Sequence, residues 1–163
     1  MLKEDKNLKI LKVSNCGLGP QGGEMIAEGL LSNKDCKLTH FHAGRDRLEN
    51  VGIIALAKVF QEMGSLEEIH VPQNGIKDSG MKELFQALCS CKNLHTVRVN
   101  DNWLKTEATE MLLSTMIQCQ DLKELNISDG NMGTANVLAV LRAYKKSGNK
   151  KLRHFCCNYN DVE

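Results

Sequence analysis

The sequence has little of what nucleic-acid-binding proteins depend on. Aromatic side chains make up 4% of the 163 residues, and the formal net charge is only +1. Binding to nucleic acid needs a dense basic surface, and binding to single strands also needs aromatic side chains for base stacking. The composition therefore argues against a nucleic-acid partner.

Long apolar runs are missing as well. No stretch approaches the roughly 18 consecutive apolar residues of a membrane span. The N-terminal MLKEDKNLKILK has no apolar signal-peptide core. We therefore expect no membrane association and an intracellular location.

Cysteines are present, but not in the arrangement of a disulfide framework. Their number, seven, is odd, and a chain of this size can fold without cross-links. Cys89-Ser90-Cys91 and Cys156-Cys157 lack the C-x2-C spacing and matching histidines of a zinc site. We expect these cysteines in the core or at its boundary, and neither a metal nor a cofactor.

Six segments repeat one apolar pattern, L-x-x-L-x-L-x-x-N/C-x-L with conservative replacements. They begin at Leu8, Leu38, Leu66, Leu94, Leu122 and Leu152. Successive copies are 28 or 30 residues apart, at or just beyond the roughly 20 to 29 residues of leucine-rich repeats. Between copies lie amphipathic segments, such as residues 52–63, 80–91 and 107–118, that indicate outer helices.

The repeats predict an α/β leucine-rich repeat solenoid. We expect a right-handed, ribonuclease-inhibitor-like horseshoe segment, with a parallel β-sheet on the concave face and helices on the convex face. Residues 1–163 would form a single domain of about six repeats. Neither end carries a polar capping unit, so we expect further repeats before the chain and a cap after it. Its exposed ends would favour self-association.

The ninth template position is polar in most copies, where a side chain can bond the backbone as the chain turns. It holds Cys16, Asp46, Asn74, Asn102 and Asn160, whereas Gly130 predicts a different turn in the fifth copy. Gly22, Gly52 and Gly80 lie just inside the expected helices, where we expect close helix–strand approach.

Positions eight and ten should line the loops that leave the strands. They hold Asn15 and Gly17, Arg45 and Arg47, Gln73 and Gly75, Asp101 and Trp103, Asp129 and Asn131, and Tyr159 and Asp161. Any one of them alone would be read as a solvated loop residue. A contiguous edge with Arg, Trp and Tyr is typical of protein interfaces. The candidate contacts here are Arg45, Arg47, Gln73, Asn74, Asp101 and Trp103.

Position five should form a second row on the concave face. It holds Lys12, His42, His70, Arg98, Asn126 and Cys156, a partly basic stripe that suits an acidic partner. The candidate contacts are His42, His70 and Arg98. His42 and His70 would be neighbours, but no third ligand at their level is evident. A solvated pair is therefore expected rather than a metal site.

Several strings resemble the leucine-rich repeat domain of the Ran GTPase-activating proteins, from about Leu8 through the fifth repeat. They are NCGLGPQGG, AGRDRLEN, PQNGI and LHTVRVNDNWL. The resemblance implies a crescent that binds the small GTPase Ran in its GTP form and stimulates hydrolysis in nuclear transport. It also implies a location in the cytoplasm or at the nuclear envelope, and an activator with no active site of its own.

The resemblance also assigns roles to residues. Asn15 precedes Cys16-Gly17-Leu18-Gly19-Pro20 and matches the family's asparagine that orients the catalytic glutamine of the GTPase, while Arg45 and Arg47 match partner-binding arginines. The family's critical arginine belongs to an earlier repeat, and its acidic tail follows the repeats. Neither is in this sequence, so the chain alone is expected to fall short of full activity.

Two other classes of protein stay open. A non-catalytic repeat scaffold would use the same face to bind a partner without changing any reaction rate. An enzyme acting on a small molecule is disfavoured, because no Ser-His-Asp set, metal cluster or phosphate loop falls into register. GLGPQGG lacks the terminal Lys-Ser/Thr of a P-loop.

Overall fold

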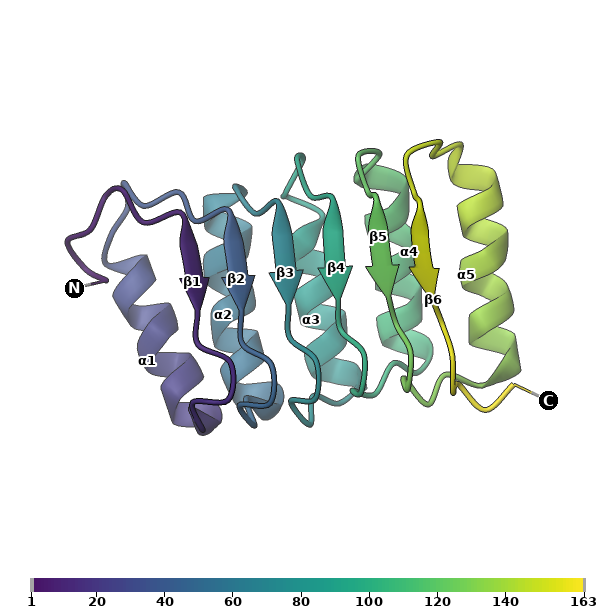
Figure 1. Cartoon of the computed structure of the whole chain (residues 1–163), viewed down its shortest axis with the longest axis horizontal. Coiled ribbons are helices and arrows are strands. Elements are labelled where there is room, and N and C mark those ends of the chain that lie inside the picture. The colour runs from purple at the N-terminus through teal and green to yellow at the C-terminus, as the bar shows by residue number, and fades with distance from the viewer. Residues whose placement is uncertain (1, 163) are drawn as a thin grey trace.

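The computed structural model describes residues 2–162 as two layers, a six-stranded sheet in front of a row of helices (Figure 1). The strands are β1 (Ile10–Lys12), β2 (His40–His42), β3 (Glu68–His70), β4 (Thr96–Arg98), β5 (Glu124–Asn126) and β6 (His154–Cys156). The helices are α1 (Gly19–Leu31), α2 (Glu49–Met63), α3 (Asp78–Leu88), α4 (Thr106–Gln118) and α5 (Gly133–Ser147).

All neighbouring strands pair in parallel, in the order β1 to β6. The register places each template position beside the same position of the next repeat, so that Lys12 lies beside His42 and His42 beside His70. The prediction of a leucine-rich repeat solenoid is confirmed.

The template leucines point into one interior between sheet and helices. Leu38, Leu66, Leu94 and Leu122 are at most 1% exposed, whereas Leu8 and Leu152 pack against the same core but are only partly buried. The difference follows from position, because an end repeat has a neighbour on one side only. The outer two leucines therefore gain less from burial than the inner four.

Buried polar side chains at the ninth position join each loop to the loop before it. Asn102 accepts hydrogen bonds from the backbone N–H groups of Asn74 and Ile76, at 3.2 and 3.0 Å. Its amide group donates to the carbonyl oxygens of Val71 and Val99, at 2.9 and 3.0 Å. The predicted bonding to the backbone is confirmed, but it links two repeats rather than serving one turn.

The prediction of a different turn in the fifth repeat is wrong, because the Gly133 N–H donates to the Asn160 carbonyl as the Gly19 N–H donates to the Asp46 carbonyl. Gly130 changes the preceding loop instead. Its backbone N–H donates to Asn160 Oδ1 at 2.8 Å, as in the other loops. Its carbonyl oxygen accepts from the backbone N–H of Leu104, which is position eleven of the preceding repeat. The carbonyl oxygen of Asn74, by contrast, accepts from the backbone N–H of Glu49, which is position twelve of the repeat before it. The loop before Gly130 is therefore shifted by one residue.

Two local predictions need correction. Helix α3 ends at Leu88 rather than at Cys91, because the chain already turns there toward the strand that follows. Gly52 and Gly80 permit close contact with the preceding helix rather than between helix and strand, whereas Gly22 lies against Leu18 of its own repeat and its neighbour Gly23 makes the helix contact. A Cβ atom on Gly23 would lie 2.7 Å from the Cα atom of Gly52, and one on Gly52 would lie 3.2 Å from the carbonyl oxygen of Pro20.

The cysteines are free thiols. Cys36, Cys91 and Cys119 are buried and Cys16 is exposed, while the other three are half-buried. Burial raises the pKa of Cys91 to about 11 and that of Cys119 to about 12, so both are protonated at neutral pH. Within residues 2–162, no helix combines the length and apolar character needed to cross a membrane.

Asn102→Ala tests the connection between loops. The substitution leaves buried backbone groups of two repeats without partners, so we expect the free energy of unfolding to fall by about 2 to 4 kcal/mol. Urea unfolding followed by circular dichroism measures the change. The exposed Asn93 provides the control, since Asn93→Ala should cost less than about 0.5 kcal/mol. If the two substitutions lowered the free energy of unfolding equally, the hydrogen bonds of the buried Asn102 amide would not stabilise the fold.

Candidate protein-binding face

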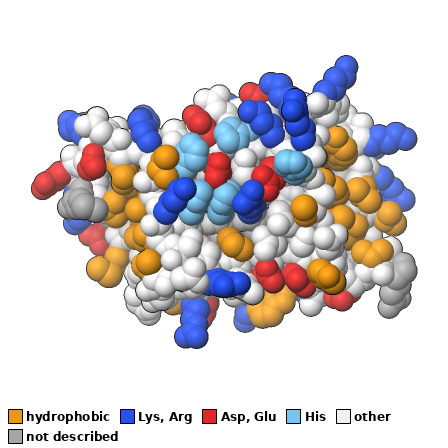
Figure 2. Space-filling model, in the orientation of Figure 1, with side chains coloured by type: hydrophobic (Ala, Val, Ile, Leu, Met, Phe, Trp, Pro, Cys, Tyr) orange, Lys and Arg blue, Asp and Glu red, His pale blue; other side chains and the backbone are white. Residues whose placement is uncertain are grey.

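The outer surface of the sheet, here called the sheet face, is formed by template positions three and five. Side chains two residues apart on a strand point to the same side, so both positions face away from the helices. Position three holds Ile10, His40, Glu68, Thr96, Glu124 and His154 beside the position-five row already described. Figure 2 shows histidine, acidic and basic side chains gathered over this face.

Acidic residues at position three neutralise much of the expected basic stripe. The Arg98 guanidinium donates to both carboxylate oxygens of Glu124, from Nε at 2.6 Å and from a terminal nitrogen at 3.0 Å. This bidentate pair raises the pKa of Arg98 and lowers that of Glu124. Arg98 therefore does not present a free positive charge to a partner.

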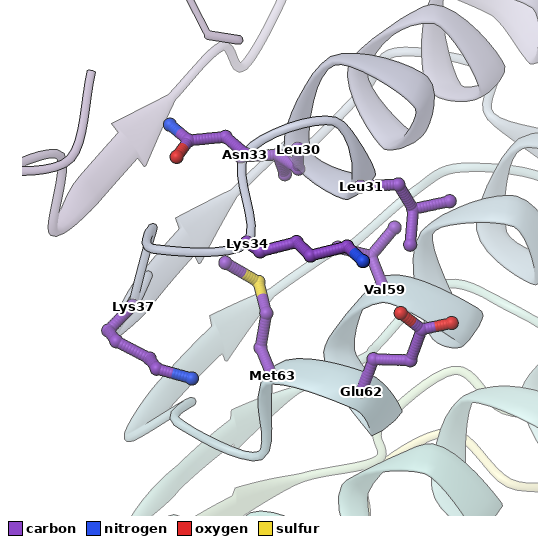
Figure 3. Close-up of a pocket in the computed structure, with 8 residues that line it drawn as sticks. All are labelled: Leu30, Leu31, Asn33, Lys34, Lys37, Val59, Glu62 and Met63. Atoms are coloured by element: carbon purple, nitrogen blue, oxygen red, sulfur yellow. The ribbon is translucent and has the colours of Figure 1, made fainter. Parts of the chain in front are cut away.

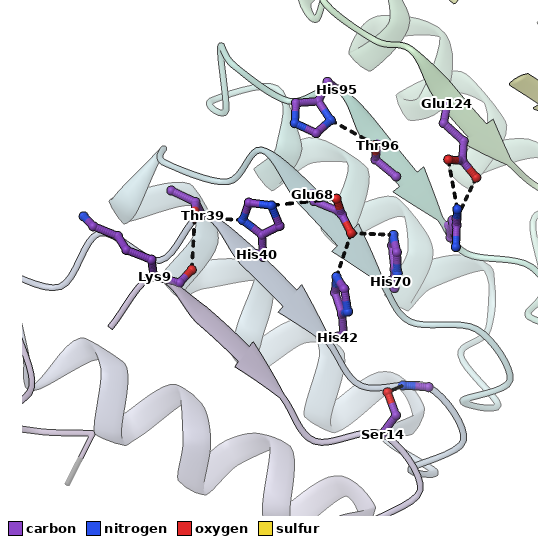
Figure 4. A network of polar contacts seen from close by, with 12 residues as sticks. Lys9, Ser14, Thr39, His40, His42, Glu68, His70, His95, Thr96 and Glu124 are labelled. Atoms are coloured by element: carbon purple, nitrogen blue, oxygen red, sulfur yellow. Dashed lines mark hydrogen bonds and ion pairs between the residues drawn. The ribbon is translucent and has the colours of Figure 1, made fainter. Parts of the chain in front are cut away.

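Two of the histidines are held around a single carboxylate oxygen. His42 Nε2 lies 2.8 Å and His70 Nε2 lies 3.0 Å from Glu68 Oε1 (Figure 4). Burial lowers the pKa of His42, and burial with the neighbouring His42 lowers the pKa of His70 to about 4. Both rings are therefore neutral at physiological pH, and the prediction of a basic stripe is corrected.

The expectation that the histidine pair lacks a third partner is also corrected. Glu68 stands two residues before His70 on β3, so that both side chains emerge on the sheet face. The sequence carried this signal in the two-residue period of a strand. The prediction rests on position five alone, whereas Glu68 lies at position three.

The loops that follow the strands form a rim, defined here as template positions eight and ten. The position-eight residues all have a positive φ, from Asn15 at 59° to Tyr159 at 54°. Position ten adds Arg47 at 54°, where the first and third repeats have Gly17 and Gly75. Non-glycine residues pay a conformational cost in this region, and such strain concentrates at functional sites.

The rim brings most of the predicted contact residues into one row. Asn15, Arg45, Arg47 and Gln73 are exposed, and Arg45 Nε donates to Gln73 Oε1 across two repeats. In the described part of the chain, the side chains of Asn15 and Arg47 make no hydrogen bond of their own. They are therefore available to a partner.

Asn74 does not belong to this row. Its side chain is 1% exposed and bonds the backbone at Ala43, Pro72, Asp46 and Leu48. The prediction that Asn74 contacts a partner is corrected, because its position in the template directs the side chain into the loop stack.

The second half of the rim is built around Trp103 and Asp101. Trp103 is 43% exposed, and Lys77 Nζ lies 6.0 Å from the centroid of its ring. Shallow hollows of about 390 and 430 Å³ lie on either side of the indole. Asp101 is half-buried and accepts from the Asn100 amide at 2.6 Å. A partner side chain could occupy one of these hollows and pack against the exposed indole.

A further hollow of about 300 Å³ lies away from the rim, between the C-terminal ends of α1 and α2 (Figure 3). It is lined by Leu30, Leu31, Asn33, Lys34, Lys37, Val59, Glu62 and Met63. One carboxylate and two flexible lysines do not form a nucleophile–base pair or a set of metal ligands. The hollow therefore gives no support to the small-molecule enzyme.

The comparisons with known proteins agree with this fold. Residues 4–27 match a family described as Leucine Rich repeat. The chain is 46% identical to Ran GTPase-activating protein 1 of Xenopus laevis over 77 aligned positions, covering 42% of this chain and 13% of the relative. It is 38% identical to Ran GTPase-activating protein of Drosophila melanogaster over 43% of this chain and 13% of the relative. It is 40% identical to Ran GTPase-activating protein 2 of Caenorhabditis elegans over 44% of this chain and 8% of the relative.

Fold and comparisons together define a leucine-rich repeat protein. Over 42 to 44% of its length, the chain is similar to part of three Ran GTPase-activating proteins. It spans about an eighth, or less, of the length of these relatives.

Substitutions at Arg47 test the rim conformation. Its φ of 54° is costly for a β-branched residue, so Arg47→Val should lower the free energy of unfolding by about 1 to 2 kcal/mol. Arg47→Asn keeps a residue that tolerates this region and should change it by less than about 0.5 kcal/mol. Chemical denaturation of the three proteins gives the comparison. A valine variant as stable as the asparagine variant would contradict the left-handed loop.

Proposed function

We propose that this chain binds Ran in its GTP form through the rim and sheet face and stimulates GTP hydrolysis by Ran, without an active site of its own. The relation to three Ran GTPase-activating proteins, at 38 to 46% identity, is the observation that carries the proposal. We further propose that this activity serves nuclear transport, in the cytoplasm or at the nuclear envelope. Binding requires no cofactor from this chain.

The proposed chemistry suits a protein that supplies positioning rather than catalytic groups. GTP hydrolysis needs an attacking water oriented by a glutamine of the GTPase and stabilisation of charge on the phosphoryl group. Asn15 has an exposed amide that can both donate to and accept from such a glutamine. Its backbone N–H donates to the Gly44 carbonyl at 2.9 Å, which fixes the loop that presents it. Asn15 would thus order the glutamine of Ran.

The neighbouring rim residues would supply affinity. Arg45 and Arg47 are exposed beside the loop of Asn15, and Trp103 lies further along the same edge. Arginine and tryptophan are the residue types on which protein interfaces most depend. Exposed arginines also raise the association rate with an acidic surface. Asn15 would act on catalysis, and the arginines on binding.

A single-turnover assay separates this function from a non-catalytic scaffold. Ran loaded with GTP is mixed with the 163-residue chain, and phosphate release is compared with the intrinsic rate, while binding is measured with a non-hydrolysable GTP analogue. We expect binding with accelerated hydrolysis. Binding without acceleration would favour the scaffold, and failure to bind Ran would overturn the proposed function.

Asn15→Asp and Asn15→Ala test the positioning role. Aspartate tolerates the φ of 59° but removes the amide donor, so both changes should reduce stimulation at saturating chain by about tenfold or more, with little change in affinity. The control is Asn131→Asp, an exposed asparagine of φ 52° in the fifth repeat of the rim, four repeats from Asn15. Unchanged stimulation by both Asn15 variants would remove this residue from the mechanism.

Charge reversal tests the arginines. Arg45→Glu and Arg47→Glu should weaken binding to Ran by about threefold to tenfold each, mainly through slower association, and should reduce its dependence on salt. Lys58→Glu makes the same charge change at an exposed position of α2, away from the rim, and should leave binding unchanged. Surface plasmon resonance at two salt concentrations provides the rates. Equal effects at all three positions would mean that only net charge matters.

A further inference from the structure

The stacked histidines of β2 and β3 form a compact cluster with Glu68. The two rings are 4.0 Å apart between centroids and inclined by 11°, and both Nε2 atoms face the same carboxylate oxygen. The side chains of His42, Glu68 and His70 are 14, 21 and 17% exposed. The cluster is therefore largely withdrawn from water but open on the side of the sheet face.

One atom of the cluster has no satisfactory partner. His70 Nε2 is buried and makes no hydrogen bond within residues 2–162, because its contact with Glu68 Oε1 has the distance but not the geometry of one. His42 Nε2 already forms a hydrogen bond with that oxygen, at 2.8 Å. Buried polar groups without partners are rare and call for an explanation.

The two imidazoles and the carboxylate of this cluster are groups that bind divalent transition-metal ions. Two imidazoles and one carboxylate bind Zn²⁺ in sites that keep a further position for water or another ligand. The ligand atoms of a tetrahedral zinc site are about 3.3 Å apart, given metal–ligand distances of about 2.0 to 2.1 Å. Here Oε1 is 2.8 and 3.0 Å from the two nitrogens, and the three ligand atoms lie within 4.8 Å of one another.

We propose that His42, Glu68 and His70 bind a divalent transition-metal ion such as Zn²⁺, with an open coordination position toward the sheet face. The lowered pKa values of both histidines favour the neutral form that a metal requires. The proton of each neutral ring resides on Nδ1 when Nε2 binds the metal. The nearly parallel rings turn about their Cβ–Cγ bonds so that both lone pairs meet one ion.

The charged side chains around the cluster are compatible with a bound cation. Lys12 and Arg98 flank the two histidines in the strand register, but Arg98 is paired with Glu124. His40 Nε2 lies 3.8 Å from Glu68 Oε2 and holds the outer oxygen of the carboxylate toward β2. The open position faces the surface where a partner would bind, so a donor atom of that partner could complete the coordination.

Metal titration of the complete chain tests the site. Isothermal titration calorimetry with Zn²⁺, and the visible absorption of Co²⁺, should show one equivalent bound in a four- or five-coordinate site without the intense band of thiolate ligation. His42→Ala and His70→Ala should each weaken binding by at least about tenfold, and Glu68→Gln should do the same with less change in shape. His154→Ala, which removes an exposed histidine of the same face, should leave binding unchanged.

A second readout covers variants that fold poorly. In the unaltered chain, Zn²⁺ should shift the ring nitrogen resonances of His42 and His70 but not those of His154, and should raise the thermal midpoint by mass action. The absence of one-equivalent binding would overturn the proposal. Undiminished binding in the His42 and His70 variants would do so as well, because the cysteines would then hold the metal.

Discussion

Lateral stacking of identical template positions is the constraint on which the rest of this structure depends. Each strand contributes only three residues, too few to fix a register through side-chain packing alone. The ninth-position side chains supply the missing specification, because Asn74, Asn102 and Asn160 each bond backbone groups of two adjacent repeats. A shift by one residue would leave these buried amides without partners, which is far costlier than the loss of a surface contact.

Because the register is fixed, properties spread along the sequence become properties of a surface. The loop residues of successive repeats form a continuous rim in a strained backbone conformation, from Asn15 to Tyr159. The same stacking joins the position-three and position-five rows into one face. On that face, acidic side chains pair with histidine and arginine side chains of neighbouring strands. The face therefore does not carry charge of a single sign. Recognition there depends on shape and on particular groups more than on net charge.

The rim and the sheet face thus have different characters. Arg45 and Arg47 on the rim are exposed, whereas Arg98 on the sheet face is held by Glu124. The exposed arginines, which have no acidic partner in the described residues, are suited to guide a partner, and the sheet face offers a pre-formed surface. This division is the basis of the proposal that a partner binds through the rim.

The sequence by itself determined the repeat, the parallel order of the strands, the inward leucines and the exposed rim, because a period of 28 or 30 residues leaves little freedom in a solenoid. Asn15, Arg45 and Trp103 could be placed on the rim by counting alone. Only the tertiary structure decided that Asn74 is buried, that Arg98 is neutralised and that Glu68 stands between His42 and His70. These outcomes depend on side-chain contacts between residues 26 or more positions apart in the sequence. A local sequence pattern does not specify which side-chain rotamer each residue adopts or which neighbour it contacts.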